Sequence, residues 1–252
     1  MFSLRSLIVC TLVSLAGTVV GANADVPAPG VVNYSEGQVA VNGQAVQTRQ
    51  GRAEVLLTPG VYLRVGENSS VKTENSASGG VKLELLGGQA LVEVDQVTPG
   101  RRVDIIDQSA DAHLERPGIY LFKAGDPVID VYSGKLRVQD DQRSIELKRG
   151  EELRLTGAPL KAQKFDRTDP GALYAWSAQR AGYSSQVSEW TAEDLLGLDG
   201  LASYSAGWYW SPWYNSWAFI PTKGYILTPF DYGLYAPQTP KYRTPVFGDF
   251  RN

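Results

Sequence analysis

The sequence has very few of the residues that build most enzyme active sites. It contains one cysteine, Cys10, and one histidine, His113. Cys10 lies in an N-terminal apolar run, so a chain without that run has no disulfide, no thiolate metal site and no thiol nucleophile. One imidazole cannot build a histidine-rich zinc site and leaves at most one histidine for acid–base chemistry. We therefore expect no metal and no cofactor.

Charge of one sign is also scarce. The formal net charge is −3, and the lysines and arginines form no basic stripe along the chain. Proteins that bind nucleic acid through its phosphates usually present such a stripe. The composition therefore argues against a nucleic-acid partner.

A long apolar run occurs only near the N-terminus. Residues 7–22 carry no charge, and Ala22-Asn23-Ala24 provides a small-x-small cleavage site. The run is shorter than the roughly 20 residues that span a bilayer, although a retained anchor is the alternative. We interpret residues 1–24 as a signal peptide and expect an unlipidated mature chain that begins at Asp25. Such a protein is periplasmic or otherwise exported and has no stable membrane span after cleavage.

Residues 25–160 have the pattern of an all-β domain. From Val39 to about Leu155, short stretches alternate apolar and polar residues, which is typical of strands with one buried face. About ten strands fit this segment and predict a sandwich, roll or solenoid. The predicted core contains Val41, Leu63, Leu83, Leu85, Val92, Val94, Ile105, Leu121, Val131, Leu147 and Leu153.

Glycine-containing turns separate the predicted strands. Ser133-Gly134 is expected to close a tight hairpin between residues 128–132 and 136–138. Three units, beginning at Gly37, Gly88 and Gly134, share a glycine, a polar residue and then alternating apolar residues. Their spacing suggests a stacked β architecture.

Residues 167–200 favour helical structure. Asp169 is a good N-cap and Pro170 suits the first helical position, so we predict a helix over Ala172–Ala181. Leu173, Trp176 and Arg180 share one face of this helix. A second short helix is predicted over 191–196, and both are expected to pack on the edge of the β domain.

Residues 201–252 form an aromatic-rich segment. The last fifty positions hold 15 of the 26 aromatic residues and 6 of the 14 prolines. Proline and glycine are too frequent for a helix, and the rings are too numerous for a solvated linker. We therefore expect an irregular tail that docks on the β domain and leaves at least one tryptophan partly exposed.

The tail supplies the candidate ligand-binding residues. Tryptophan and tyrosine combine a flat apolar face with a polar tip, which suits contact with sugars or with proteins. In an extended segment alternate rings point the same way and can form a platform. Structural wrapping of the β domain, glycan or peptidoglycan contact, and contact with an envelope protein all remain open. The candidates are Trp208, Trp210, Trp213, Tyr214 and Trp217.

The sequence evidence for catalytic groups is weaker than that for a binding role of the tail. Asp111-Ala112-His113 is not accompanied by a nucleophile elbow, which argues against a hydrolytic triad. The candidate carboxylate pairs of a glycosidase are Glu93 with Asp95 and Asp104 with Asp107, but we expect most of them on the solvated face of half-buried strands. We therefore predict a protein that is not an enzyme, with a carboxylate-based hydrolase as the last alternative.

Several motifs between Gly37 and Leu155 resemble the FecR-like domain family. They are Gly-x-Val-x-Val-Asn-Gly at 37–43, Leu-Thr-Pro-Gly at 57–60, Gly-Glu-Asn-Ser at 66–69 and Gly-x-Leu-x-Val at 134–138. The resemblance covers about half of the chain. It implies an all-β periplasmic domain without catalytic residues, which in known members relays receptor occupancy to an anti-sigma system.

The arrangement around the motifs departs from that of the known regulators. Those proteins have a cytoplasmic anti-sigma segment and a transmembrane helix before the β domain, whereas here a short predicted signal peptide precedes it. The chain therefore resembles the stand-alone exported subgroup. This resemblance implies a binding, scaffold or signalling module of the envelope, and direct control of a sigma factor is not expected.

Overall fold

The computed structural model describes residues 26–75, 80–107, 110–139, 143–156, 161–196 and 205–237. The predicted signal peptide, its cleavage site and Cys10 lie outside the described residues.

Fourteen strands form one large sheet, and all of the pairs between them are antiparallel except that of β5 with β7. Their order is β12-β11-β8-β7-β5-β4-β2-β3-β6-β9-β10-β13-β14, with β1 paired to β2. The bounds are β1 Val31–Asn42, β2 Ala45–Leu56, β3 Val61–Val65, β4 Ser70–Asn75, β5 Val81–Gly87, β6 Gln89–Val94, β7 Val103–Asp107, β8 Ala110–Leu114, β9 Gly118–Lys123, β10 Val128–Ser133, β11 Lys135–Gln139, β12 Ser144–Lys148, β13 Glu151–Arg154 and β14 Ala162–Lys164.

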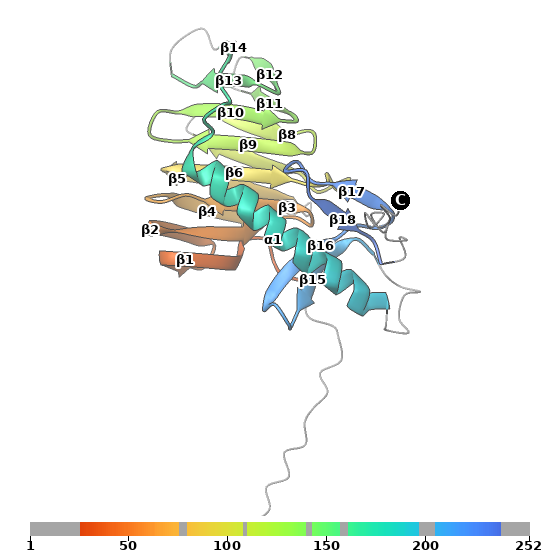
Figure 1. The fold of residues 1–252 in the computed structure, drawn as a ribbon. Helices are drawn as coiled ribbons and strands as arrows, with labels where there is room; N and C mark the ends of the chain where they lie inside the picture. The colour runs from red at the N-terminus through yellow and green to blue at the C-terminus, as the bar shows by residue number, and fades with distance from the viewer. Residues whose placement is uncertain are drawn as a thin grey trace, which may run out of the picture.

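The sheet folds back on itself into two layers, because β2 pairs with β4 through its first residues and with β3 through its last. One layer contains β3, β6, β9, β10, β13 and β14. We call it the helix-side layer, since α1 (Gly171–Leu196) runs across it (Figure 1). The other layer, with β4, β5, β7, β8, β11 and β12, is the open layer. Side chains from both layers pack into one core, which confirms the predicted all-β domain followed by a helical segment.

The chain passes between the layers at glycine corners. Gly88 (φ 77°) lies between β5 and β6, and Gly134 (φ 88°) lies between β10 and β11. A Cβ at Gly134 would lie 2.3 Å from the Tyr120 hydroxyl, so only glycine fits. The hairpin predicted at Ser133-Gly134 is wrong, because β10 pairs with β9 and β13 while β11 pairs with β8 and β12.

The predicted core is confirmed at every position but one. Leu63, Leu83 and the other core residues proposed above are buried, although Leu121 points toward α1 and not into the space between the layers. Val41 is wrong, since its side chain is 55% exposed. It lies next to the β1–β2 turn, where β1 pairs with β2 alone.

A single helix, α1, replaces the two predicted ones. The Asp169 side chain accepts a hydrogen bond from the Gly171 amide at 3.3 Å, but the helix begins at Gly171 (φ 81°), so the predicted start with Pro170 as the first helical residue is wrong by one position. The helix continues through Gly182, where a Cβ would lie 2.9 Å from the Tyr232 ring. Its buried residues recur every three or four positions and are mostly small or polar: Leu173, Trp176, Ser177, Arg180, Ala181, Ser184, Val187, Ser188, Thr191 and Ala192.

The aromatic segment is ordered as two hairpins, so the expectation of an irregular tail is wrong for residues 205–237. Strands β15 (Gly207–Ser211) and β16 (Ser216–Ile220) form one hairpin, and β17 (Tyr225–Leu227) and β18 (Gly233–Tyr235) form the other. Docking is confirmed, because Trp208 and Phe219 pack against Tyr62 of β3. Residues 238–252 lie outside the described residues.

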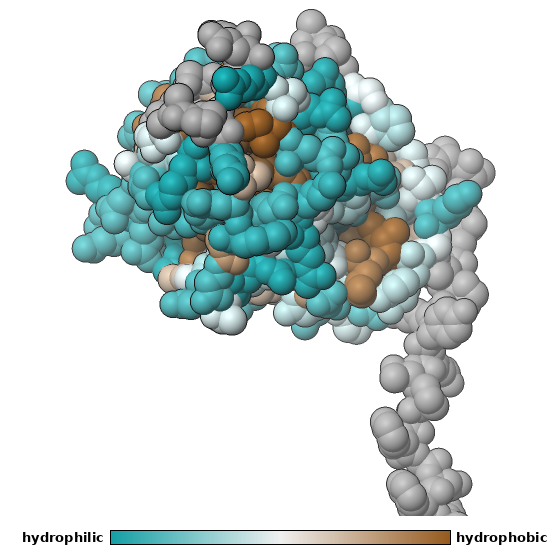
Figure 2. All heavy atoms as spheres, turned by 90° about the horizontal axis from the view of Figure 1, so that it is seen from above, coloured by the Kyte–Doolittle hydropathy of each residue, from teal (hydrophilic) through white to brown (hydrophobic). Residues whose placement is uncertain are grey.

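One end of the molecule presents a largely polar surface (Figure 2). Seen from above, at the end of the molecule near β14, hydrophilic side chains cover most of the surface and hydrophobic ones emerge in few places (Figure 2). Within the described part of the chain, no helix has the length and apolar character needed to cross a bilayer.

Candidate functional site

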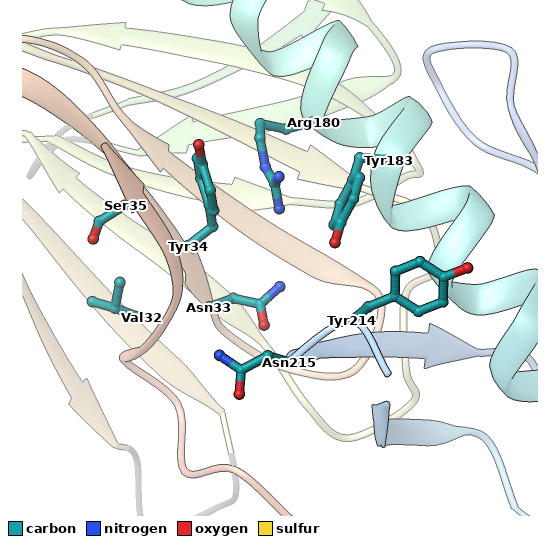
Figure 3. Close-up of a pocket in the computed structure, with 8 residues that line it drawn as sticks. All are labelled: Val32, Asn33, Tyr34, Ser35, Arg180, Tyr183, Tyr214 and Asn215. Carbon is teal, nitrogen blue, oxygen red and sulfur yellow. The ribbon is translucent and has the colours of Figure 1, made fainter. Parts of the chain in front are cut away.

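Three segments that are distant in sequence meet around a pocket of about 630 Å³. Residues 32–35 of β1 form one wall, α1 contributes Arg180 and Tyr183, and the β15–β16 turn contributes Tyr214 and Asn215 (Figure 3). Pockets of this volume commonly hold small molecules. Because Tyr214 and Asn215 supply one wall, the pocket exists only when the aromatic segment is docked.

Arg180 lies at the centre of the pocket wall. Its guanidinium carbon is 4.0 Å from the ring centroid of Tyr34 and 4.7 Å from that of Tyr183, so it lies against both rings. Its Nε and Nη2 atoms donate to the carboxylate of Glu54 at 3.3 and 3.0 Å. The positive charge of Arg180 is thus balanced by a carboxylate from β2.

A buried ion-pair network extends from Arg180 into the helix-side layer. Glu54 also pairs with Arg64 of β3 at 3.2 Å, and Arg64 donates to Glu93 of β6 at 2.5 Å. Asp95 lies just beyond Glu93, and all four of these charged side chains are almost completely buried. Charges this deep are tolerated when they are paired.

The network changes the proton affinity of its members. Burial raises the pKa of Asp95 well above its usual range, and the negative charge of Glu93 raises it further. Burial also raises the pKa of Glu93, although Arg64 opposes this shift. For Arg64, burial alone would lower the pKa, but Glu93 and Glu54 raise it above the ordinary value. Asp95 therefore holds its proton more tightly in the folded protein than a solvated aspartate does.

Asn33 fastens the aromatic hairpin to the first strand. Its Oδ1 accepts a hydrogen bond from the Trp217 amide at 2.8 Å, and its Nδ2 donates to the Trp217 carbonyl at 3.2 Å. The same Nδ2 donates to Glu54 at 2.9 Å. One side chain thus links β1, β2 and β16 and fixes the turn beside the pocket.

The predicted ligand-binding residues divide into different environments. Trp208 is buried and 4.9 Å from Tyr62 between ring centroids, so it anchors the hairpin. Trp210 and Trp217 form a cross-strand pair at 5.4 Å. Trp213 is 81% exposed at the turn, and only Tyr214 of the five predicted residues lines the pocket.

The flat platform expected from Trp208 and Trp210 does not form. Both rings belong to the same face of β15, but Trp208 is covered by the β domain while Trp210 is partly exposed. The prediction of a partly exposed tryptophan is confirmed by Trp213. Whether any of the five residues binds a ligand stays a prediction.

The candidate catalytic residues are engaged in other contacts. Glu93 and Asp95 are buried, so the expectation that they lie on a solvated face is wrong. His113 contacts Asp104 at 2.5 Å and Arg102 at 3.0 Å, and these contacts within the described chain include no serine hydroxyl. The Asp107 side chain lies outside the described part. Across the described residues, no group of three histidine, cysteine or acidic side chains could hold a metal ion.

Comparisons with known proteins give limited similarity. No family model matches the sequence, and no curated protein matches it. Two crystal structures of proposed anti-sigma factors from Parabacteroides distasonis are similar to this chain at 18% and 17% identity, with TM-scores of 0.42 and 0.45. The matches cover 48% and 53% of this chain and 58% and 64% of those proteins, so the chain spans less than two thirds of their length.

Sequence reasoning missed most of the residues that line the pocket. Tyr34, Tyr183 and Asn215 lie outside the motifs and carry no pattern of their own. Arg180 did carry a signal, because an arginine on the same helix face as Leu173 and Trp176 needs a buried acidic partner. That signal predicts a carboxylate beneath the helix without naming Glu54.

Proposed function

We propose that the protein is a non-catalytic binding module of the cell envelope, with a FecR-like β domain and an aromatic contact surface on the β15–β16 turn. One observation carries the proposal: the hairpin is anchored by Trp208, yet it holds Trp213 81% exposed at its tip. Exposed aromatic side chains on a fixed scaffold are characteristic of binding surfaces. The sequence motifs and the predicted signal peptide support the family and the location.

The positions of the acidic and histidine side chains support a non-catalytic role. Glu93 is ion-paired with Arg64 beneath the hairpin, and His113 is paired with Asp104 on the outer face of the open layer. Neither arrangement places two carboxylates or a base and nucleophile at the pocket, whose lining includes no acidic residue. The geometry thus favours binding over hydrolysis.

Export and retention by the envelope can be tested on the same preparation. The full chain, expressed with its predicted signal peptide, should be recovered with Asp25 as its first residue by intact-mass analysis. The purified mature protein should cosediment with isolated envelope material. Trp213→Ala should reduce this retention several-fold without moving the unfolding midpoint, since an exposed ring contributes little to stability.

Leu86→Ala is the matched control. Leu86 is 55% exposed on β5 of the open layer, whereas the hairpin packs against Tyr62 of the helix-side layer, so retention should be unchanged. A retained Met1 would contradict cleavage of the signal peptide, and equal retention of the wild type and Trp213→Ala would contradict the proposed contact surface.

A further inference from the structure

We infer that the pocket between β1, α1 and the β15–β16 turn binds a neutral saccharide. The inference deepens the proposed function, since both rest on the docked turn at residues 212–215. It names the chemical class of a ligand and a site that differs from the exposed ring of Trp213. The argument depends on the charge, the rings and the free polar groups of the pocket.

The charged side chains at the pocket argue against an anionic ligand. Arg180 is the one cationic side chain among the residues lining the pocket, and two of its nitrogen atoms donate to Glu54. Glu36 lies on the adjacent part of β1, within 3.4 Å of the Tyr34 hydroxyl, and its carboxylate pairs with Arg52 at 3.7 Å. A phosphate or carboxylate entering the pocket would meet no uncompensated positive charge and would lose its hydration.

The rings favour a ligand with flat apolar faces. Tyr183 and Tyr214 meet edge to face at 6.3 Å between centroids, and Tyr214 is about one-third exposed. Tyr34 forms the opposite wall, as Figure 3 shows. Tyrosine rings present an apolar face together with a polar tip, and the C–H face of a sugar ring matches that surface.

The polar groups that remain free are uncharged. Ser35, Tyr183, Tyr214 and Asn215 make no side-chain hydrogen bond to the other described residues, whereas the amide of Asn33 is fully used between Glu54 and Trp217. Hydroxyl and amide groups can both donate and accept, as sugar hydroxyls do. The Arg180 guanidinium lies between the Tyr34 and Tyr183 rings and is neutralised by Glu54. The Tyr214 ring and the uncharged polar groups beside it therefore define the saccharide site.

Binding is tested by calorimetry on the mature full chain. The probes are the neutral trisaccharides chitotriose, cellotriose and maltotriose, with trigalacturonic acid as the anionic comparison. Each probe is titrated up to about 10 mM, a concentration at which even a millimolar Kd is detected. At least one neutral probe should bind under these conditions. The anionic probe should bind at least about tenfold more weakly, because carboxylates lose hydration without gaining a partner.

Variants on opposite walls locate the site. Tyr214→Ala and Asn215→Gly should each weaken the neutral probe about tenfold, and glycine keeps the left-handed conformation of Asn215 (φ 47°). Ser35→Ala changes the β1 wall without touching the turn and should weaken binding about fivefold. Trp213→Ala, outside the pocket, should leave the affinity within about twofold.

Three results would overturn the inference: no binding of any neutral probe, tighter binding of the anionic probe, or unchanged affinity in all three pocket variants. Loss of binding in Trp213→Ala alone would transfer the saccharide site to the exposed turn and also overturn it. Failure of this experiment with intact envelope retention would refute the saccharide pocket and leave the proposed function standing. Loss of envelope retention with intact saccharide binding would refute the proposed function and leave the saccharide pocket standing.

Discussion

The helix-side layer and the open layer are made of similar short strands, but they differ in what covers their outer faces. In the open layer, β4, β5 and β11 alternate buried and exposed residues. In the helix-side layer, every residue of β3 is buried, and β6, β9 and β10 are buried almost throughout. The second apolar layer that produces this burial comes from α1 and the aromatic hairpins.

The same comparison explains why charged residues behave differently in the two layers. Lys72 and Glu74 of β4 form an exposed ion pair in the open layer. Arg64 of β3 and Glu93 of β6, on adjacent strands of the helix-side layer, are sealed beneath the helix and hairpin. The cover therefore converts a surface ion pair into a buried one, whose loss is far more costly. It also creates the pocket, because two of the three pocket walls belong to the cover.

The largest effect should come from breaking the buried network. Arg64→Met should lower the free energy of unfolding by about 3–5 kcal/mol, because Glu93 is left buried without its partner. Urea unfolding measures the loss. Lys72→Met, the corresponding change in the open layer, should leave the urea midpoint unchanged. Equal losses in the two variants would remove the distinction between the layers.

The second-largest effect should come from removing Trp208, which anchors the β15–β16 hairpin to the β domain. Trp208→Ala should cost about 3 kcal/mol, since it empties the space between Tyr62 and Phe219. It should also speed proteolysis within residues 205–237 while the β domain stays intact. Trp208→Phe is the matched variant: it keeps an aromatic ring and removes an indole N–H that has no hydrogen-bond partner within the described residues. A hairpin that resists protease equally in all three proteins would show that Trp208 is not its anchor.

The sequence alone predicts the open layer better than the covered one. Strands such as β5 reveal themselves because Val81, Leu83 and Leu85 alternate with polar residues that face solvent. Strands such as β3 and β6 carry Arg64 and Glu93 at fully buried positions, and a charged residue in a sequence pattern indicates solvent. The failure for Glu93 thus has a physical cause, since its partner Arg64 comes from another strand.

The sequence does not predict the full length of α1 or the pocket, for related reasons. The buried stripe of α1 contains Ser177, Ser184 and Ser188, so it lacks the apolar periodicity that identifies an amphipathic helix. Glycine corners were recognised as turns, but local turn chemistry does not determine which layer the chain enters next. The pocket joins residues 32–35 to residues 214–215, and that association depends on packing of the whole chain.

The smallest effect concerns the protonation of Asp95 under the cover. Burial and Glu93 raise the pKa of this carboxyl, so the folded protein binds its proton more tightly than the unfolded chain does. Stability from this group is therefore greatest below the ordinary carboxyl pKa of about 3.9 and is lost as pH rises toward the folded pKa. Asp95→Asn stays neutral, so its urea midpoint should fall less than that of the wild type as pH rises. Asp111→Asn changes an exposed carboxylate of the open layer and should leave the wild-type slope unaltered. Parallel curves for wild type and Asp95→Asn would show that the cover does not set the proton affinity of this site.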